Sequence, residues 1–205
     1  MNRCIVVGAG EFDTPIRTPG TGDLVIAADG GFTYLSQSGI HADVVVGDFD
    51  SLKTRPDHPC VLELPKEKDD TDLLFALKYG LKCDYKEFHI YGGTGGRADH
   101  TIANLQSLLF LAKQGARGFL YGGGCAYTCI ANTEMTFDEK YKGTVSVFAW
   151  GGDAKGVNLE GLYYPLVDAH LTPDFPLGVS NSFTGQKSKI TVKEGALLIV
   201  YPTEK

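Results

Sequence analysis

Long hydrophobic runs are missing from this sequence. The apolar stretch at residues 4–7 is far shorter than the roughly 20 residues of a membrane-spanning helix or the roughly 7–15 apolar residues of a signal peptide. No later stretch approaches the length of a membrane span. We therefore expect a cytoplasmic protein with no membrane partner.

The sequence also lacks a cluster of basic residues. Its 19 Lys and Arg residues are scattered and are outnumbered by 25 Asp and Glu residues, which gives a formal net charge of −6. Proteins that hold nucleic acid by its phosphates concentrate positive charge on one face. We therefore expect no nucleic-acid partner. Any phosphate-bearing ligand should be small and neutralised locally, for example by a metal ion.

Paired cysteines are absent as well. The chain has 5 cysteines, an odd number, and none of them form a C-x-x-C pair. This spacing argues against a disulfide framework and against a zinc knuckle. We expect the cysteines to be reduced and mostly buried.

The first part of the chain alternates between apolar runs and helical periods. A hydrophobic content of 43% and a charged content of 21% are ordinary for a folded protein of one large or two small domains. Helices are predicted at 32–38, at 73–77 with Gly80 as the stop, and at 98–114. The predicted strands are residues 4–7, 24–28, 44–46, 61–64, 88–91 and 118–121. This alternation predicts an α/β domain at residues 1–122, with a mainly parallel, Rossmann-like sheet whose ligands bind at the carboxyl ends of the strands.

The pattern changes after the three glycines at 122–124. From there the sequence shows only short alternating runs separated by turn residues, and no convincing helical period. The runs are residues 125–130, 134–137, 144–150, 162–166, 179–183, 189–192 and 196–201. We therefore expect an all-β domain at residues 123–205, folded as an antiparallel sandwich.

Residues 91–106 join a predicted strand to a predicted helix through a loop with four glycines. Such a loop lets the backbone approach a ligand closely, and a helix start directs N–H groups at an anion. Arg97 adds a guanidinium fork, and Asp99 is of the type that caps a helix or holds a cation. No Gly-Lys-Ser/Thr follows, so the loop is not a Walker motif. Phosphate binding and a purely conformational turn both remain open for this stretch.

Four carboxylates are predicted at the carboxyl edge of the sheet: Asp48, Asp50, Asp72 and Asp99. Hard oxygen ligands in such a group suit Mg²⁺, which binds one or two protein carboxylates together with phosphate oxygens and water. Aspartates also populate turns and helix caps for structural reasons alone. Their number favours a metal–phosphate site. His100 could act in acid–base chemistry or be structural.

Six motifs, taken in chain order, resemble those of the thiamine pyrophosphokinase family. They are Ala27-Ala28-Asp29-Gly30-Gly31, Gly47-Asp48-Phe49-Asp50-Ser51, Asp69-Asp70-Thr71-Asp72, residues 92–100 with Asn104, Gly161-Leu162-Tyr163-Tyr164-Pro165-Leu166 and Val179-Ser180-Asn181. The resemblance covers nearly the whole chain. It implies an α/β domain for nucleotide, metal and catalysis, and a β-sandwich domain for thiamine binding and dimerisation. It also implies a homodimer whose active sites are shared between subunits.

The resemblance further implies transfer of the pyrophosphoryl group of ATP, the co-substrate, to the hydroxyl of thiamine. By that similarity the Mg²⁺ ligands are Asp48, Asp50 and Asp72, and the catalytic set adds Arg97 and Asp99. The implied nucleotide contacts are Asp29, Gly30, Thr71, Gly95, Gly96, Arg97, His100 and Asn104. The implied thiamine contacts are Tyr164, Ser180 and Asn181.

Two other functions stay open on the sequence alone. Asp48 and Asp50 also match the metal-binding Asp-x-Asp of a nucleotide-sugar transferase. The same fold could instead serve a non-catalytic module that binds nucleotide or thiamine.

Overall fold

The computed structural model describes residues 2–49, 57–65, 67 and 69–203. The chain forms two compact units. Unit 1 comprises Met1–Ser107 and Gly118–Gly123, and unit 2 comprises Leu108–Arg117 and Gly124–Lys205. Among the residues described, no helix is both long and apolar enough to cross a membrane.

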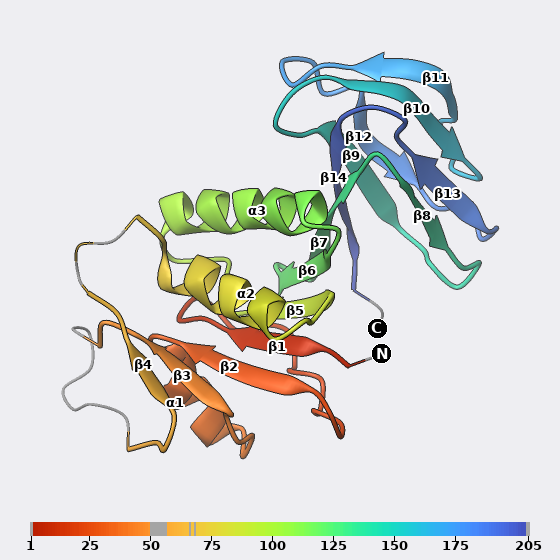
Figure 1. Cartoon of the computed structure of the whole chain (residues 1–205). Helices are drawn as coiled ribbons and strands as arrows, with labels where there is room; N and C mark the ends of the chain where they lie inside the picture. The colour runs from red at the N-terminus through yellow and green to blue at the C-terminus, as the bar shows by residue number, and fades with distance from the viewer. Residues whose placement is uncertain (1, 50–56, 66, 68, 204–205) are drawn as a thin grey trace. The chain divides into compact units, whose positions relative to one another are not determined.

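Unit 1 is built on parallel strands (Figure 1). The strand order is β6-β5-β1-β2-β3-β4, and β1 pairs in parallel with both β2 and β5. The strands are β1 (Cys4–Val7), β2 (Leu24–Ala28), β3 (Val44–Gly47), β4 (Val61–Glu63), β5 (Glu87–Tyr91) and β6 (Arg117–Gly122). All four residues of β1 are fully buried, as expected of a central strand covered on both faces.

The chain has three helices in its described residues: α1 (Gly31–Gln37) and α2 (Asp72–Lys82), which pack on the strands of unit 1, and α3 (Ala98–Lys113), which begins in unit 1. Figure 1 shows α1 on one side of the strands and α2 on the other. Thr71 begins α2, because its Oγ1 accepts a hydrogen bond of 3.1 Å from the Leu74 N–H. The predicted parallel pairing is therefore observed for β1 with β2 and β5, for β2 with β3 and for β3 with β4, within a sheet that is mixed as a whole.

The prediction that Gly80 ends α2 is wrong, because the helix continues to Lys82. Gly80 is buried where the helix crosses the strands. A Cβ at this position would lie 2.6 Å from the Phe88 ring and 2.8 Å from Cys4 Sγ. The glycine thus permits close packing of helix on sheet and is not a helix stop.

Unit 2 is all-β apart from the end of α3, and its strands fall into two antiparallel sets. One set has the order β12-β9-β14-β7, and the other has the order β11-β10-β13-β8. The strands are β7 (Cys125–Ala131), β8 (Glu134–Phe137), β9 (Thr144–Ala149), β10 (Ala154–Glu160), β11 (Leu166–Leu171), β12 (Gly178–Ser182), β13 (Ser188–Thr191) and β14 (Ala196–Pro202). Phe137 packs against the rings of Tyr141, Phe183 and Tyr201 in the core.

Two strands of unit 2 differ from the sequence prediction. Strand β10 was not predicted, because register shifts put its buried apolar residues at 154, 157 and 159 instead of at every second position. The strand predicted at 162–166 is also wrong, since β11 begins only at Leu166. It is an edge strand with mostly exposed side chains, so it lacks an alternating apolar pattern.

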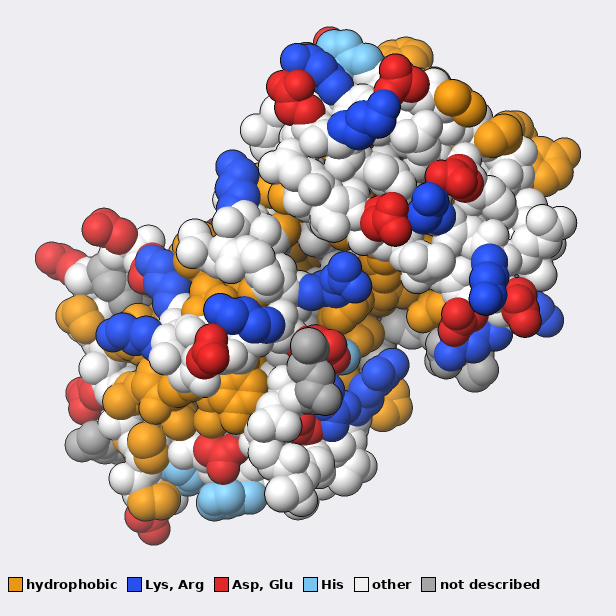
Figure 2. All heavy atoms as spheres, turned by 45° about the vertical axis from the view of Figure 1, so that its right-hand side comes forward, with side chains coloured by type: hydrophobic (Ala, Val, Ile, Leu, Met, Phe, Trp, Pro, Cys, Tyr) orange, Lys and Arg blue, Asp and Glu red, His pale blue; other side chains and the backbone are white. Residues whose placement is uncertain are grey.

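The five cysteines are free, but only Cys4 and Cys129 are buried, so the prediction that most are buried was wrong. On the face drawn in Figure 2, Lys and Arg side chains lie among Asp and Glu side chains, in line with their scatter in the sequence.

Candidate functional site

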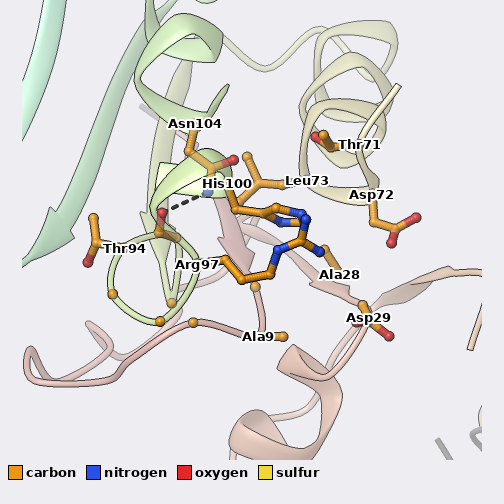
Figure 3. A pocket seen from close by; sticks show the side chains of 16 residues that line it. Ala9, Ala28, Asp29, Thr71, Asp72, Leu73, Thr94, Arg97, His100 and Asn104 are labelled. Atoms are coloured by element: carbon orange, nitrogen blue, oxygen red, sulfur yellow. Dashed lines mark hydrogen bonds between the residues drawn. The ribbon is translucent and has the colours of Figure 1, made fainter. Parts of the chain in front are cut away.

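A pocket of about 340 Å³ lies within unit 1 at the carboxyl ends of the parallel strands (Figure 3). It is formed where β1, β2 and β5 end and where α2 and α3 begin. Its lining comprises residues 8–10, 28–29, 71–73, 92–97, 100 and 104. Ligands of parallel α/β sheets bind at this edge, so the pocket is where the predicted site should be.

The glycine loop, residues 92–96, forms one wall of the pocket. Gly92, Gly95 and Gly96 have φ values of +61°, +76° and +60°, in the left-handed region that favours glycine. Asn104 of α3 holds the loop in place. Its side-chain Nδ2 donates to the Gly93 carbonyl at 2.7 Å, which is the dashed line in Figure 3. This predicted nucleotide contact therefore also shapes the loop.

Residues 8–13 run beside the glycine loop. The N–H groups of Gly8, Gly10 and Glu11 donate to the carbonyls of Tyr91, Gly92 and Thr94 at 2.8, 2.7 and 2.9 Å. The backbones approach so closely that a Cβ at position 10 would lie 2.5 Å from the Thr94 carbonyl oxygen. Residues 8–10 line the pocket, although they were not among the site residues predicted from the sequence.

Two aspartates of the predicted site line the pocket: Asp72, a predicted Mg²⁺ ligand, and Asp29, a predicted nucleotide contact. Figure 3 places both side chains on the side of the pocket opposite Thr94. Asp29 follows β2 with a φ of +49°, and its N–H donates to the Val46 carbonyl at 2.7 Å. Asp48 follows the neighbouring strand β3 and is half-buried, but it is not among the lining residues. Asp50 lies outside the described residues.

The donor chemistry of this edge fits Mg²⁺. Asp29 and Asp48 follow adjacent parallel strands, since Ala28 pairs with Val46 in the register. Carboxylate oxygens are the ligands that Mg²⁺ takes, and one or two from protein suffice when phosphate and water complete the shell. Within the described part of the chain, no three acidic, His or Cys side chains are grouped closely enough to hold a metal alone.

Arg97 and Asp99 form an exposed ion pair at the start of α3. Arg97 donates from Nη2 to Asp99 Oδ2 at 2.6 Å and from Nε to Oδ1 at 3.2 Å. The hydrogen bond from Arg97 lowers the pKa of the Asp99 carboxyl. Arg97 lines the pocket and Asp99 does not. In this structure Asp99 therefore contacts the predicted phosphate-binding guanidinium, and the guanidinium contributes to the pocket wall.

The remaining predicted nucleotide contacts divide into two groups. Thr71 and His100 line the pocket, as do Gly95 and Gly96, whereas Gly30 precedes α1 and does not. Thr94 is a buried lining residue that was not predicted from the sequence. A Cβ on Gly122 would lie 1.8 Å from Thr94 Oγ1, so this side chain packs directly against the end of β6. Its only signal in the sequence is its place between two glycine pairs.

The three predicted thiamine contacts lie in unit 2. Asn181 is 2% exposed, and its side chain bonds both backbone groups of Tyr164: Oδ1 accepts from N at 2.9 Å, and Nδ2 donates to O at 2.7 Å. Ser180 is exposed, with a φ of +59° beside a register shift of β12. Asn181 therefore fixes the backbone at Tyr164, whose ring is exposed.

Models of known protein families match residues in both units. A family model described as the catalytic domain of thiamin pyrophosphokinase matches residues 20–120, and one described as its vitamin B1 binding domain matches residues 132–197. The chain belongs to the thiamin pyrophosphokinase family. Members of this family are enzymes, and the family predicted from the six motifs is confirmed.

Relatives in this family are similar along the whole chain. The chain is 28% identical over 188 residues to the thiamine pyrophosphokinase of Bacillus subtilis (strain 168), covering 88% of each sequence. A crystal structure of the thiamine pyrophosphokinase from Bacillus subtilis has a TM-score of 0.86 at 25% identity, covering 100% of both chains. Yeast thiamin pyrophosphokinase has a TM-score of 0.75 at 15% identity, covering 98% of this chain and 86% of its own, which is a likeness of fold alone.

Proposed function

We propose that this chain is a thiamine pyrophosphokinase that makes thiamine diphosphate and AMP from thiamine and ATP. The proposal rests on one observation. The family model of the catalytic domain matches residues 20–120, and most of the residues that line the glycine-loop pocket fall in this range. In the reaction the thiamine hydroxyl oxygen bonds to the β-phosphorus of ATP. The bond from that phosphorus to the oxygen bridging the α-phosphate breaks, AMP leaves with that oxygen, and the hydroxyl proton passes to a carboxylate of the pocket.

Arg97 and the glycine loop are proposed to bind the phosphates of ATP. A guanidinium at the start of a helix offers a planar fork that matches phosphate oxygens. Backbone N–H groups at a helix start favour anions in the same place. Positioning and charge stabilisation carry most of the rate in phosphoryl transfer, so a preformed loop is the main requirement. The proposed nucleotide contacts also include Thr71, His100, Asn104 and Asp29, together with Gly30 at the start of α1.

Asp48, Asp50 and Asp72 are proposed to hold Mg²⁺. When bound, the cation neutralises phosphate charge and orients the β-phosphorus. Asp72 stands at the first residue of α2 and on the pocket wall, and Asp29 lies on the same side. These residues keep anionic oxygens at the pocket edge in a chain of net charge −6, where the cation offsets repulsion of ATP.

Residues 123–205 are proposed to bind thiamine and to form a homodimer. Apart from Ile102, the large exposed hydrophobic side chains of the described chain all lie within residues 163–179. They are Tyr163, Tyr164, Val167, Phe175, Leu177 and Val179. Exposed apolar side chains in such number favour contact with a partner surface, and the family resemblance makes that partner a second copy. The proposed location is the cytoplasm.

Incubation with thiamine, ATP and Mg²⁺ tests the reaction. We expect equal amounts of AMP and thiamine diphosphate, and no product without thiamine or after chelation of the metal. Formation of ADP with thiamine monophosphate would show γ-phosphoryl transfer. Glycosyl transfer from a nucleotide sugar, or tight binding of ATP and thiamine without turnover, would favour the alternatives that the sequence left open.

A further inference from the structure

Two acidic residues of the segment beside the glycine loop bind glycine N–H groups. Glu11 Oε1 accepts from the Gly96 N–H at 3.1 Å, and Asp13 Oδ2 accepts from the Gly123 N–H at 2.5 Å. The same segment already donates three backbone hydrogen bonds to residues 91–94. It therefore contacts both glycine-rich turns of unit 1, the one after β5 and the one after β6.

The Glu11 carboxylate lies outside the pocket. Gly95 and Gly96 line the pocket, but Glu11 does not. A Cβ on Gly95 would lie 2.4 Å from Glu11 Cδ, so the carboxyl group rests against the loop backbone. The Gly96 N–H is accordingly directed at Glu11 and is not a free donor for an incoming anion. Glu11 acts on the loop and not on a ligand in the pocket.

Residues 95 and 96 have backbone conformational freedom that the contact with Glu11 limits. Gly95 and Gly96 both have positive φ, and a Cβ on Gly96 would meet no atom within 4 Å. Glycine residues in open space have many backbone conformations to lose when a ligand binds. Asn104 restrains the loop at Gly93, and Glu11 restrains it three residues later, at the point where α3 begins.

We propose that Glu11 is a positioning residue, whose carboxylate preshapes residues 95–96 for the phosphates of ATP. The inference rests on the proposed function for the identity of the anion. The hydrogen bond lowers the conformational entropy that the loop loses on binding, so nucleotide affinity rises although Glu11 itself is negatively charged. If the Glu11 carboxylate instead occupied the position of a phosphate group, ATP would have to displace it, and Glu11 would lower the affinity for ATP.

The test compares Glu11→Ala, Glu11→Gln and a control, Glu139→Ala, which removes an exposed acid of unit 2. ATP affinity is measured by calorimetry with Mg²⁺, and amide hydrogen exchange is measured for the peptide covering residues 92–98. We expect Glu11→Ala to weaken ATP binding about tenfold, the effect of one lost hydrogen bond plus loop ordering, and to speed exchange in this peptide. Glu11→Gln keeps an oxygen acceptor and should stay within about twofold of wild type.

Each of the following results would contradict the proposal. Tighter ATP binding by both Glu11 variants would make Glu11 a competing anion, and equal loss in Ala and Gln would mean that charge matters and not the acceptor. Unchanged ATP affinity in Glu11→Ala would show that Glu11 has no role in nucleotide binding. If wild type bound no ATP, the proposed function would fail, whereas unchanged exchange in Glu11→Ala would refute the restraint itself.

Discussion

At the scale of single residues, the pocket separates carboxylates that face a ligand from those that serve other contacts. Asp72 is on the pocket wall at the start of α2, whereas Asp69, three residues earlier, is exposed and is not part of the lining. These two aspartates differ in location and not in chemistry. They therefore make a matched pair for mutation.

We predict that Asp72→Asn lowers kcat by at least about a hundredfold while the protein stays folded, because the substitution removes charge needed to hold Mg²⁺. Asp69→Asn should leave kcat unchanged. Steady-state kinetics over a range of Mg²⁺ concentrations checks this, with circular dichroism as the measure of folding. Wild-type turnover by Asp72→Asn at saturating Mg²⁺ would remove Asp72 from the proposed metal ligands.

The guanidinium of Arg97 gives a second residue-scale prediction. Arg97→Lys keeps the positive charge but loses the planar fork that now binds both oxygens of Asp99. We expect about tenfold weaker ATP binding, measured by calorimetry, because a single ammonium cannot replace two parallel donors. Arg117→Lys, at an exposed position of β6, is the control. Equal ATP affinity in both variants would make Arg97 a structural residue.

At the scale of elements, one buried carboxylate ties the start of β1 to the turn before β2. Asp23 accepts hydrogen bonds from the Arg3 N–H at 2.8 Å, from Arg3 Nε at 3.1 Å and from the Gly20 N–H at 2.9 Å. Burial of the carboxylate raises its pKa, but the hydrogen bonds from Arg3 and Gly20 outweigh this, and the net pKa falls from 3.8 to about 2. The folded pKa is therefore below the unfolded pKa.

The lowered pKa of Asp23 predicts how the free energy of unfolding depends on pH. The contribution of Asp23 is complete above pH 3.8 and is lost as the pH falls toward 2, since the unfolded state binds the proton first. A shift of this size corresponds to about 2 kcal/mol. We expect Asp23→Asn to lower the free energy of unfolding by about that amount at pH 7, measured by urea denaturation, with a flatter loss of stability below pH 4. Asp138→Asn, at an exposed site, should match wild type at both pH values.

At the scale of the whole molecule, the two family matches assign the proposed catalysis to unit 1 and the proposed thiamine binding to unit 2. The pocket residues of the catalytic match belong to unit 1, and the predicted thiamine contacts belong to unit 2. Unit 2 also carries the exposed apolar side chains of residues 163–179. A C2 dimer in which each site takes its acids from one subunit and Ser180 and Asn181 from the other accommodates both observations.

We predict that mixing two inactive chains restores activity. Asp72→Asn disables the first half of a shared site, and Asn181→Ala disables the second half by releasing the backbone of Tyr164. In a mixed dimer, one site has both halves intact and the other has both lesions. Up to about a quarter of wild-type activity should return after subunit exchange, since about half of the dimers are mixed and each has one working site. Exchange without any recovery would mean that each chain builds its own site.

Whether a feature could be predicted from the sequence depends on how far apart along the chain the interacting residues lie. The buried strands at 4–7 and 24–28 coincide with β1 and β2, because a continuous apolar run between turns is a local signal. The glycine loop was likewise recognised as a candidate site from its own residues and from the helix that follows it. Strand β10 was missed because its register shifts, which depend on its neighbours, remove the alternation from its sequence.

The sequence by itself therefore determined the alternation of strands and helices in the first 120 residues and the family, since each is carried by local patterns or by motifs in order. Only the tertiary structure decided which residues line the pocket. It placed Asp29 and Asp72 on the pocket wall, left Asp48 off it, and brought Glu11 onto the Gly96 N–H across 85 residues of chain. The physical reason is that close approach of distant backbones depends on packing and register, as with Gly80 against Phe88, and such contacts leave no periodic signal along the sequence.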